Sequence, residues 1–151
     1  MKILIVGGAG YIGSVCAEQL LDRGHEVAIL DNLTEGHRAA VDPRADFIAG
    51  DLQDRPGTLS ILSRQRPEAV MHFAASALVG ESMENPSKYF RNNVANGLNL
   101  LDAMVEAGVP RLVFSSTCAI FGPPERVPID ETLPPRPINP YGESKLLFEK
   151  V

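Results

Sequence analysis

Short apolar runs alternate along the chain with longer stretches of helical periodicity. Residues 3–6 are apolar on both faces and mostly β-branched, which is typical of a central strand in a parallel sheet with helices on both sides. Residues 11–23 carry apolar side chains at helical spacing, and Gly24 follows where a helix C-cap glycine is expected. The pattern predicts a strand, a covering helix and a second strand over residues 26–30.

The alternation continues after a polar loop at residues 32–44. Further strands are expected at residues 45–49, 68–74 and 111–114, and further helices at 55–66, 86–107 and 139–151. Five strands separated by helices predict an α/β fold, a doubly wound parallel sheet of the Rossmann type with strand order 3-2-1-4-5. The 151 residues are expected to form one domain, 1–151, in which the chain stops inside its last helix.

Three glycines follow the first strand at a spacing of three residues: Gly7, Gly10 and Gly13. In a dinucleotide-binding turn the first glycine permits the bend, the second lets backbone N–H groups approach a pyrophosphate, and the third allows close packing of the helix. A helix that begins near Tyr11 directs its free N–H groups at that anion. A plain turn is the alternative, but the strand before the glycines and the helix after them favour a phosphate site.

Two acidic residues end strands where an adenosine would lie. Asp31 follows the second strand and is placed to accept hydrogen bonds from ribose hydroxyls, and it would repel a 2′-phosphate. Asn32 and Leu33 follow where an arginine would favour NADP, so the expected cofactor is NAD. Asp51, after the third strand, has two open interpretations: it caps a turn, or it accepts a hydrogen bond from the adenine amino group.

Polar and small residues accompany the fourth strand and the long helix after it. His72 lies inside the strand, where a histidine is more often a buried core residue than a catalyst. The small residues at 74–77 either let a flat ligand lie against the backbone or form a tight turn. Asn92 and Asn93 lie mid-helix, where asparagine is disfavoured, so one of them is expected to bond a ligand or the neighbouring strand.

Tyr141 and Lys145 lie four residues apart on the last helix and therefore share a face. A phenol has an ordinary pKa of about 10, and a nearby ammonium group together with a positively charged nicotinamide favours the phenolate. After a dinucleotide fold, this pair is expected to transfer a proton. Thr117, at the end of the fifth strand, is a candidate to hold the same substrate hydroxyl, whereas Ser115 and Ser116 are expected to cap the strand end.

Composition excludes several classes of function. The net charge is −5 and there is no basic run, so nucleic acid is not an expected partner. Cys16 and Cys118 lie far apart without a metal-binding spacing, which predicts reduced thiols and neither a disulfide framework nor a metal site. Met1 leads directly into a strand and no apolar stretch reaches membrane-spanning length, so a cytoplasmic protein with no membrane partner is expected.

Several motifs in this order and spacing resemble those of the UDP-glucose 4-epimerases, which are extended short-chain dehydrogenases/reductases. The resemblance covers nearly the whole chain and rests on residues 7–13, 31–33, 50–52, 72–75, 79–82, 92–94, 115–122 and 139–145. It implies contacts to NAD from Gly7, Gly10, Tyr11, Ile12, Asp31, Asn32, Asp51, Leu52, Phe73, Ala74, Ala75, Asn93, Tyr141 and Lys145. It further implies that Thr117 and Tyr141 act on the sugar.

The resemblance implies 4-epimerisation of a UDP-hexose through a 4-keto sugar, with NAD kept bound, and a homodimer for the full-length form. It also implies a C-terminal substrate lobe that lies outside this chain. A nucleotide-sugar 4,6-dehydratase or another sugar-nucleotide epimerase is the alternative enzyme. The dehydratase family has an Asp-Glu pair after the threonine, where this chain has Cys118 and Ala119. A second alternative is an NAD-binding module without catalysis.

Overall fold

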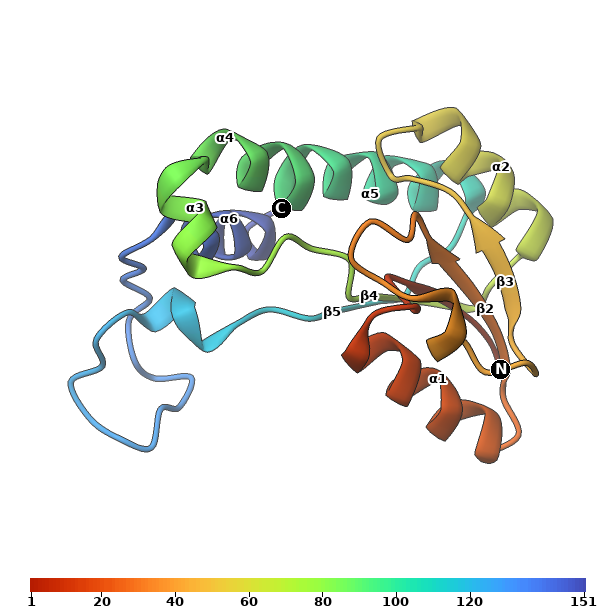
Figure 1. Cartoon of the computed structure of the whole chain (residues 1–151), viewed down its shortest axis with the longest axis horizontal. Helices are drawn as coiled ribbons and strands as arrows, with labels where there is room; N and C mark the ends of the chain where they lie inside the picture. Colours follow the sequence, from red (N-terminus) through yellow and green to blue (C-terminus); the bar gives the residue numbers. More distant parts are fainter. The chain divides into compact units, whose positions relative to one another are not determined.

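The computed structural model describes residues 1–151, which divide into two compact units. The first unit comprises residues 1–74 and 98–115, and the second comprises 75–97 and 116–151. The first unit holds a parallel sheet of β1 (Lys2–Val6), β2 (Glu26–Asp31), β3 (Asp46–Ala49), β4 (Ala69–His72) and β5 (Leu112–Phe114). Its order is β3-β2-β1-β4-β5, which confirms the predicted topology and the Rossmann-like fold (Figure 1).

Helices cover both faces of this sheet. Helix α1 (Tyr11–Asp22) lies on one face, and α2 (Arg55–Gln65) and α5 (Asn96–Ala107) lie on the other (Figure 1). Along β1, Leu4 and Val6 belong to the core on the side of α2 and α5, whereas Ile3 and Ile5 belong to the core on the side of α1. Because β1 is central and buried on both faces, its apolar run has no polar alternation.

The predicted element boundaries differ from the observed ones by a few residues. The fourth strand ends at His72, because the N–H groups of Phe73 and Ala74 both donate to Val6 O and the chain leaves the ladder there. The helix predicted over 55–66 ends at Gln65, since Arg66 adopts a left-handed conformation with φ of 48°. The polar loop at 32–44 contains a short 3₁₀ turn, η1 (Arg38–Ala40).

The second unit is built from short helical segments. They are α3 (Val79–Glu84), α4 (Pro86–Tyr89), η2 (Phe90–Ala95), η3 (Cys118–Phe121) and α6 (Pro140–Glu149). Figure 1 shows α6 beside α3 and α4, and α6 also packs against η2 and η3. The single helix predicted over 86–107 is wrong in one respect, because η2 is a π-helical segment between α4 and α5. Helix α3 was not predicted; its six residues are too few for a periodicity to be detected.

None of the helices combines the length and the apolar character that a bilayer crossing requires.

Candidate active site

The glycine loop after β1 is shaped by two close backbone approaches in the first unit. Gly7 has φ of +82°, its N–H donates to Leu30 O at 2.8 Å, and a Cβ there would overlap the backbone of Ala74. A Cβ on Gly13 would overlap Gly7 O and lie 2.8 Å from Gly8 Cα. The third glycine is therefore required by the loop itself, and not by contact between the helix and the strand, as the sequence pattern had suggested.

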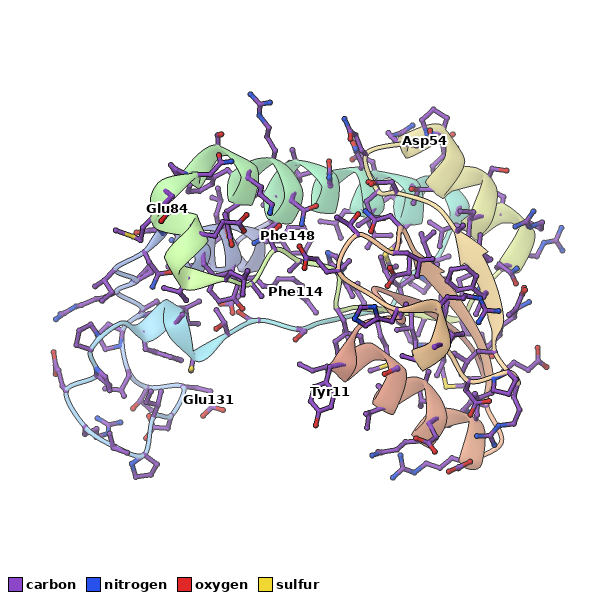
Figure 2. The ribbon with its side chains drawn as sticks, in the orientation of Figure 1. Tyr11, Asp54, Glu84, Phe114, Glu131 and Phe148 are labelled. Atoms are coloured by element: carbon purple, nitrogen blue, oxygen red, sulfur yellow. The ribbon has the colours of Figure 1, made fainter.

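Helix α1 begins at Tyr11, as predicted, and no side chain caps its N-terminus because the N-cap residue is Gly10. Tyr11 and Ile12 are 87% and 59% exposed, and Figure 2 shows the Tyr11 ring standing clear of the helix. An uncapped twelve-residue helix presents backbone N–H donors and the positive end of its dipole. This donor set fits the pyrophosphate of a dinucleotide such as NAD.

Asp31, at the end of β2, is buried and already hydrogen-bonded. Its Oδ2 accepts from Ala9 N at 2.9 Å, and its Oδ1 accepts from Leu33 N at 2.8 Å. The carboxylate therefore joins the end of β2 to the glycine loop. A carboxylate oxygen has more than one acceptor position, so hydrogen bonds from ribose hydroxyls are compatible with these contacts.

The side chain of Asp51 contacts Asn32, the residue that follows β2. Its Oδ2 accepts from Asn32 Nδ2 at 2.8 Å, and its Oδ1 accepts from Gln53 N at 2.8 Å. The turn-capping interpretation of Asp51 is thus realised, and its contact to adenine stays a prediction. Leu52 is buried, and its carbonyl accepts from Asn99 Nδ2 at 2.9 Å.

Phe73 and Ala74 stay beside the glycine loop because both bond Val6 O, at 2.8 and 3.1 Å. His72 is buried, as predicted, with its ring 5.7 Å from that of Phe114.

In the first unit the structure gathers most of the predicted cofactor contacts at the C-terminal ends of β1, β2, β3 and β4. They are Gly7, Gly10, Tyr11, Ile12, Gly13, Asp31, Asn32, Asp51, Leu52, Phe73 and Ala74.

The second unit contains Ala75, Asn93, Thr117, Tyr141 and Lys145. Helix α6 is started by Asn139, whose Oδ1 accepts from Gly142 N at 2.8 Å, and by Pro140 at its first position. Tyr141 and Lys145 lie one turn apart on this helix. Lys145 is only 3% exposed, and this burial lowers the pKa of its ammonium group to about 8.

The Tyr141 ring packs edge-on against Tyr89, with 6.3 Å between centroids and 77° between planes. Tyr89 is fully buried, and its hydroxyl lies 2.6 Å from Leu78 O and 2.7 Å from Glu81 Oε2. Lys88 Nζ lies 2.6 Å from Glu81 Oε1. Hydrogen bonds from Lys88 and then Tyr89 lower the pKa of Glu81, so a charged carboxylate anchors the tyrosine behind Tyr141.

Thr117 and Asn93 both make hydrogen bonds within the second unit. Thr117 Oγ1 accepts from Ala119 N at 3.2 Å, which leaves the hydroxyl proton for another acceptor. Asn93 is buried and bonds Ser76, which lies in the loop after β4 and not in the strand itself, so the predicted bond to the neighbouring strand is not found. Its contact to NAD stays a prediction.

Two residues of this unit were not singled out from the sequence. Tyr89 lies within the helix predicted over 86–107, and its contact with Tyr141 depends on the fold. Ser144 lies between Tyr141 and Lys145 and bonds Asn93, which is far away in the sequence. The only signal for Ser144 was a serine inside a helix, where serine is mildly disfavoured.

Comparison with known proteins identifies the family. The NAD dependent epimerase/dehydratase family matches residues 3–151. The chain belongs to this family. The family resemblance inferred from the sequence motifs is thereby confirmed. Individual UDP-glucose 4-epimerases are also similar to the chain.

The UDP-glucose 4-epimerase of Streptococcus mutans is 54% identical over 154 residues, covering 100% of this chain and 46% of the relative. That of Lacticaseibacillus casei is 51% identical over 151 residues, again covering 100% of this chain and 46% of the relative. The crystal structure of UDP-glucose 4-epimerase from Brucella ovis in complex with NAD matches with a TM-score of 0.96 and 46% identity, over 99% of this chain and 46% of that one. The chain thus spans less than half the length of these relatives.

Proposed function

We propose that residues 1–151 are the NAD-binding Rossmann part of a UDP-glucose 4-epimerase, with the acid–base groups for the reaction on the same chain. Membership of the epimerase/dehydratase family supports this, as does similarity to UDP-glucose 4-epimerases along the whole chain. The observation that carries the proposal is on α6, where Tyr141 shares a helical face with the buried Lys145.

In the first unit, the N-terminus of α1 and the glycine loop would hold the pyrophosphate of NAD. Asp31 would bond the ribose hydroxyls, and its charge would disfavour the 2′-phosphate of NADP. When bound, NAD would accept hydride from C4 of the sugar and return it to the opposite face.

In the second unit, Tyr141 would take the proton of the sugar 4-hydroxyl and return it afterwards. The cationic ammonium group of Lys145 lies one turn away on the same face of the helix. Lys145 holds that charge below a pH of about 8, the pKa set by its burial. Thr117 would donate a hydrogen bond to the same sugar oxygen, since its own hydroxyl oxygen already accepts a hydrogen bond from Ala119 N.

The residues after Thr117 favour epimerisation over 4,6-dehydration. Dehydration requires an additional acid and base to remove water across C5 and C6 of the sugar. Cys118 and Ala119 occupy those positions in η3, and a thiol and a methyl group do not meet this need. Epimerisation at C4 needs only the proton transfer by Tyr141, supported by Lys145 and Thr117, and the reversible transfer of a hydride that bound NAD would supply.

We further propose that the protein acts on UDP-sugars as a homodimer in the cytoplasm. Exposed apolar side chains of the second unit, among them Leu78, Met83 and Leu147, support self-association. The free thiols of Cys16 and Cys118 are compatible with a reducing compartment. Sedimentation equilibrium of the protein tests the dimer, and the mass of a single chain at all concentrations would contradict it.

Two experiments test the enzymatic proposal. Calorimetric titration of the chain with NAD should give one binding site, and absence of binding would overturn the assignment. In a chimera, this chain replaces the matching part of the Streptococcus mutans relative, and the product is incubated with UDP-galactose. We expect UDP-glucose to form, and Tyr141→Phe to reduce the rate about 10²–10⁴-fold.

Accumulation of a 4-keto-6-deoxy sugar by the chimera would favour the dehydratase instead. NAD binding by the chain, together with an inactive chimera, would favour a binding module without catalysis.

A further inference from the structure

A buried hydrogen bond joins Asn93 of η2 to Ser144 of α6. Asn93 Nδ2 donates to Ser144 Oγ at 3.0 Å, and the two residues are 2% and 0% exposed. Ser144 Oγ in turn donates to Tyr141 O at 2.8 Å. The hydroxyl of Ser144 therefore accepts from η2 and donates to the turn of α6 that carries Tyr141.

The other contacts of Asn93 use the rest of its amide. Its Oδ1 accepts from Ser76 N at 2.9 Å and from Asn92 Nδ2 at 3.2 Å. Its Nδ2 also donates to Ser76 O at 3.0 Å. A primary amide has two acceptor positions and two donor protons, so all four are occupied within the protein. A hydrogen bond from this side chain to a bound molecule would break one of these contacts.

The backbone around Asn93 departs from a regular α-helix. Residues Phe90–Ala95 form a π-helical segment, in which Asn93 and Val94 are buried. Such segments are uncommon and often occur at functional sites. Asparagine is also disfavoured inside helices, so neither the residue nor the backbone is explained by helix stability. The buried contacts to Ser76 and Ser144 account for the asparagine at this position.

We propose that Asn93 and Ser144 are a positioning pair that sets the register of α6 against η2 and thereby holds Tyr141 and Lys145 in place for proton transfer. This inference rests on the proposed acid–base role of those two residues. Apolar contacts tolerate sliding of one helix along another, whereas a hydrogen bond is limited in distance and angle. A slip of one residue along α6 would move the Ser144 hydroxyl by about 1.5 Å along the axis and rotate it by about 100°.

The chain offers a matched control in Ser82 of α3. Ser82 is also 0% exposed, and its Oγ donates to Val79 O, three residues earlier, at 2.7 Å. The corresponding bond of Ser144 goes to Tyr141 O, also three residues earlier. Ser144→Ala and Ser82→Ala therefore lose the same local bond, and only Ser144→Ala loses the bond from Asn93.

The experiment measures the pKa of Lys145 in the full chain by NMR of ¹³C-labelled lysine. We expect Ser144→Ala to raise the Lys145 pKa by about one unit, because a less constrained α6 admits water. We expect Ser82→Ala to leave the Lys145 pKa unchanged. Equal effects of the two substitutions on this pKa would overturn the inference.

A second variant, Asn93→Ala, tests the inference if Ser144→Ala perturbs folding. In Asn93→Ala the Lys145 pKa should rise as in Ser144→Ala, and the double variant should show no larger rise than Asn93→Ala alone. Additive shifts would contradict a pair that acts together. The proposed function fails separately: if Tyr141→Phe leaves the chimera active, the acid–base role is wrong, whatever the NMR comparison gives.

Discussion

The carboxylate of Asp31 accepts a hydrogen bond from the backbone N–H of Ala9, with 2.9 Å between Oδ2 and N. This contact holds the glycine loop against the end of β2, so the residue expected to select the cofactor also shapes the loop that is expected to bind its pyrophosphate. Substitutions at Asp31 should therefore affect both the choice and the strength of cofactor binding.

We predict that the chain binds NAD at least about tenfold more tightly than NADP, because a carboxylate and a 2′-phosphate repel each other. Asp31→Asn keeps an acceptor oxygen for Ala9 N and removes the charge, so it should reduce the ratio of the NADP to the NAD dissociation constant. Calorimetric titration with both cofactors measures this ratio. Glu18→Gln, at an exposed position of α1, removes the same charge and should leave the ratio unchanged; equal binding of NAD and NADP by the wild type would refute the prediction.

We predict that Gly13→Ala abolishes NAD binding and lowers the free energy of unfolding by about 1–3 kcal/mol. The added Cβ overlaps Gly7 O, which belongs to backbone and cannot move aside independently. Gly80→Ala is the control, since Gly80 also lies in a helix but a Cβ there meets nothing within 4 Å. Denaturant unfolding should show Gly80→Ala to be neutral or stabilising by about 0.4–1 kcal/mol. Similar losses in both variants would show that the loop contact is not the cause.

We predict that the difference in free energy of unfolding between the wild type and Lys145→Met depends on pH. Its pKa falls from the ordinary value of 10.5 to about 8 on folding, so between these values the unfolded chain binds more protons than the folded chain. The free energy of unfolding of the wild type should therefore rise with pH relative to that of Lys145→Met, by up to about 1.4 kcal/mol per unit. Below pH 8 the difference should be constant. Urea unfolding of both proteins across pH 7–10.5 measures it, and a flat difference throughout would contradict the lowered pKa.

We predict that Tyr89→Phe lowers the free energy of unfolding by about 1–3 kcal/mol, because it removes the hydroxyl bonded to Leu78 and Glu81 in a fully buried site. Tyr11→Phe is the matched control at a position 87% exposed, and it should be neutral. Chemical denaturation of the two variants makes the comparison. An unchanged midpoint for Tyr89→Phe would mean that the buried hydroxyl contributes nothing to stability.

Much of the first unit could be predicted because its signals are local. The apolar run of β1, the glycines at 7, 10 and 13, and Asp31 at the end of β2 each depend on neighbours within a few residues. The strand order also followed, since parallel strands joined by right-handed crossovers leave few topologies. The pairing of Tyr141 and Lys145 on α6 could be predicted for the same reason, because a four-residue spacing on a helix determines a shared face.

Only the tertiary structure decided the surroundings of that pair. The contact of Asn93 with Ser144 and the packing of Tyr89 on Tyr141 each join residues separated by about 50 positions, and no local pattern indicated the π-helical segment η2. Hydrogen-bond partners and burial arise when distant segments meet, and the pKa of Lys145 is lowered by burial that no local pattern specifies. The sequence by itself therefore determined the fold and the candidate chemical groups, whereas the tertiary structure decided how those groups are held.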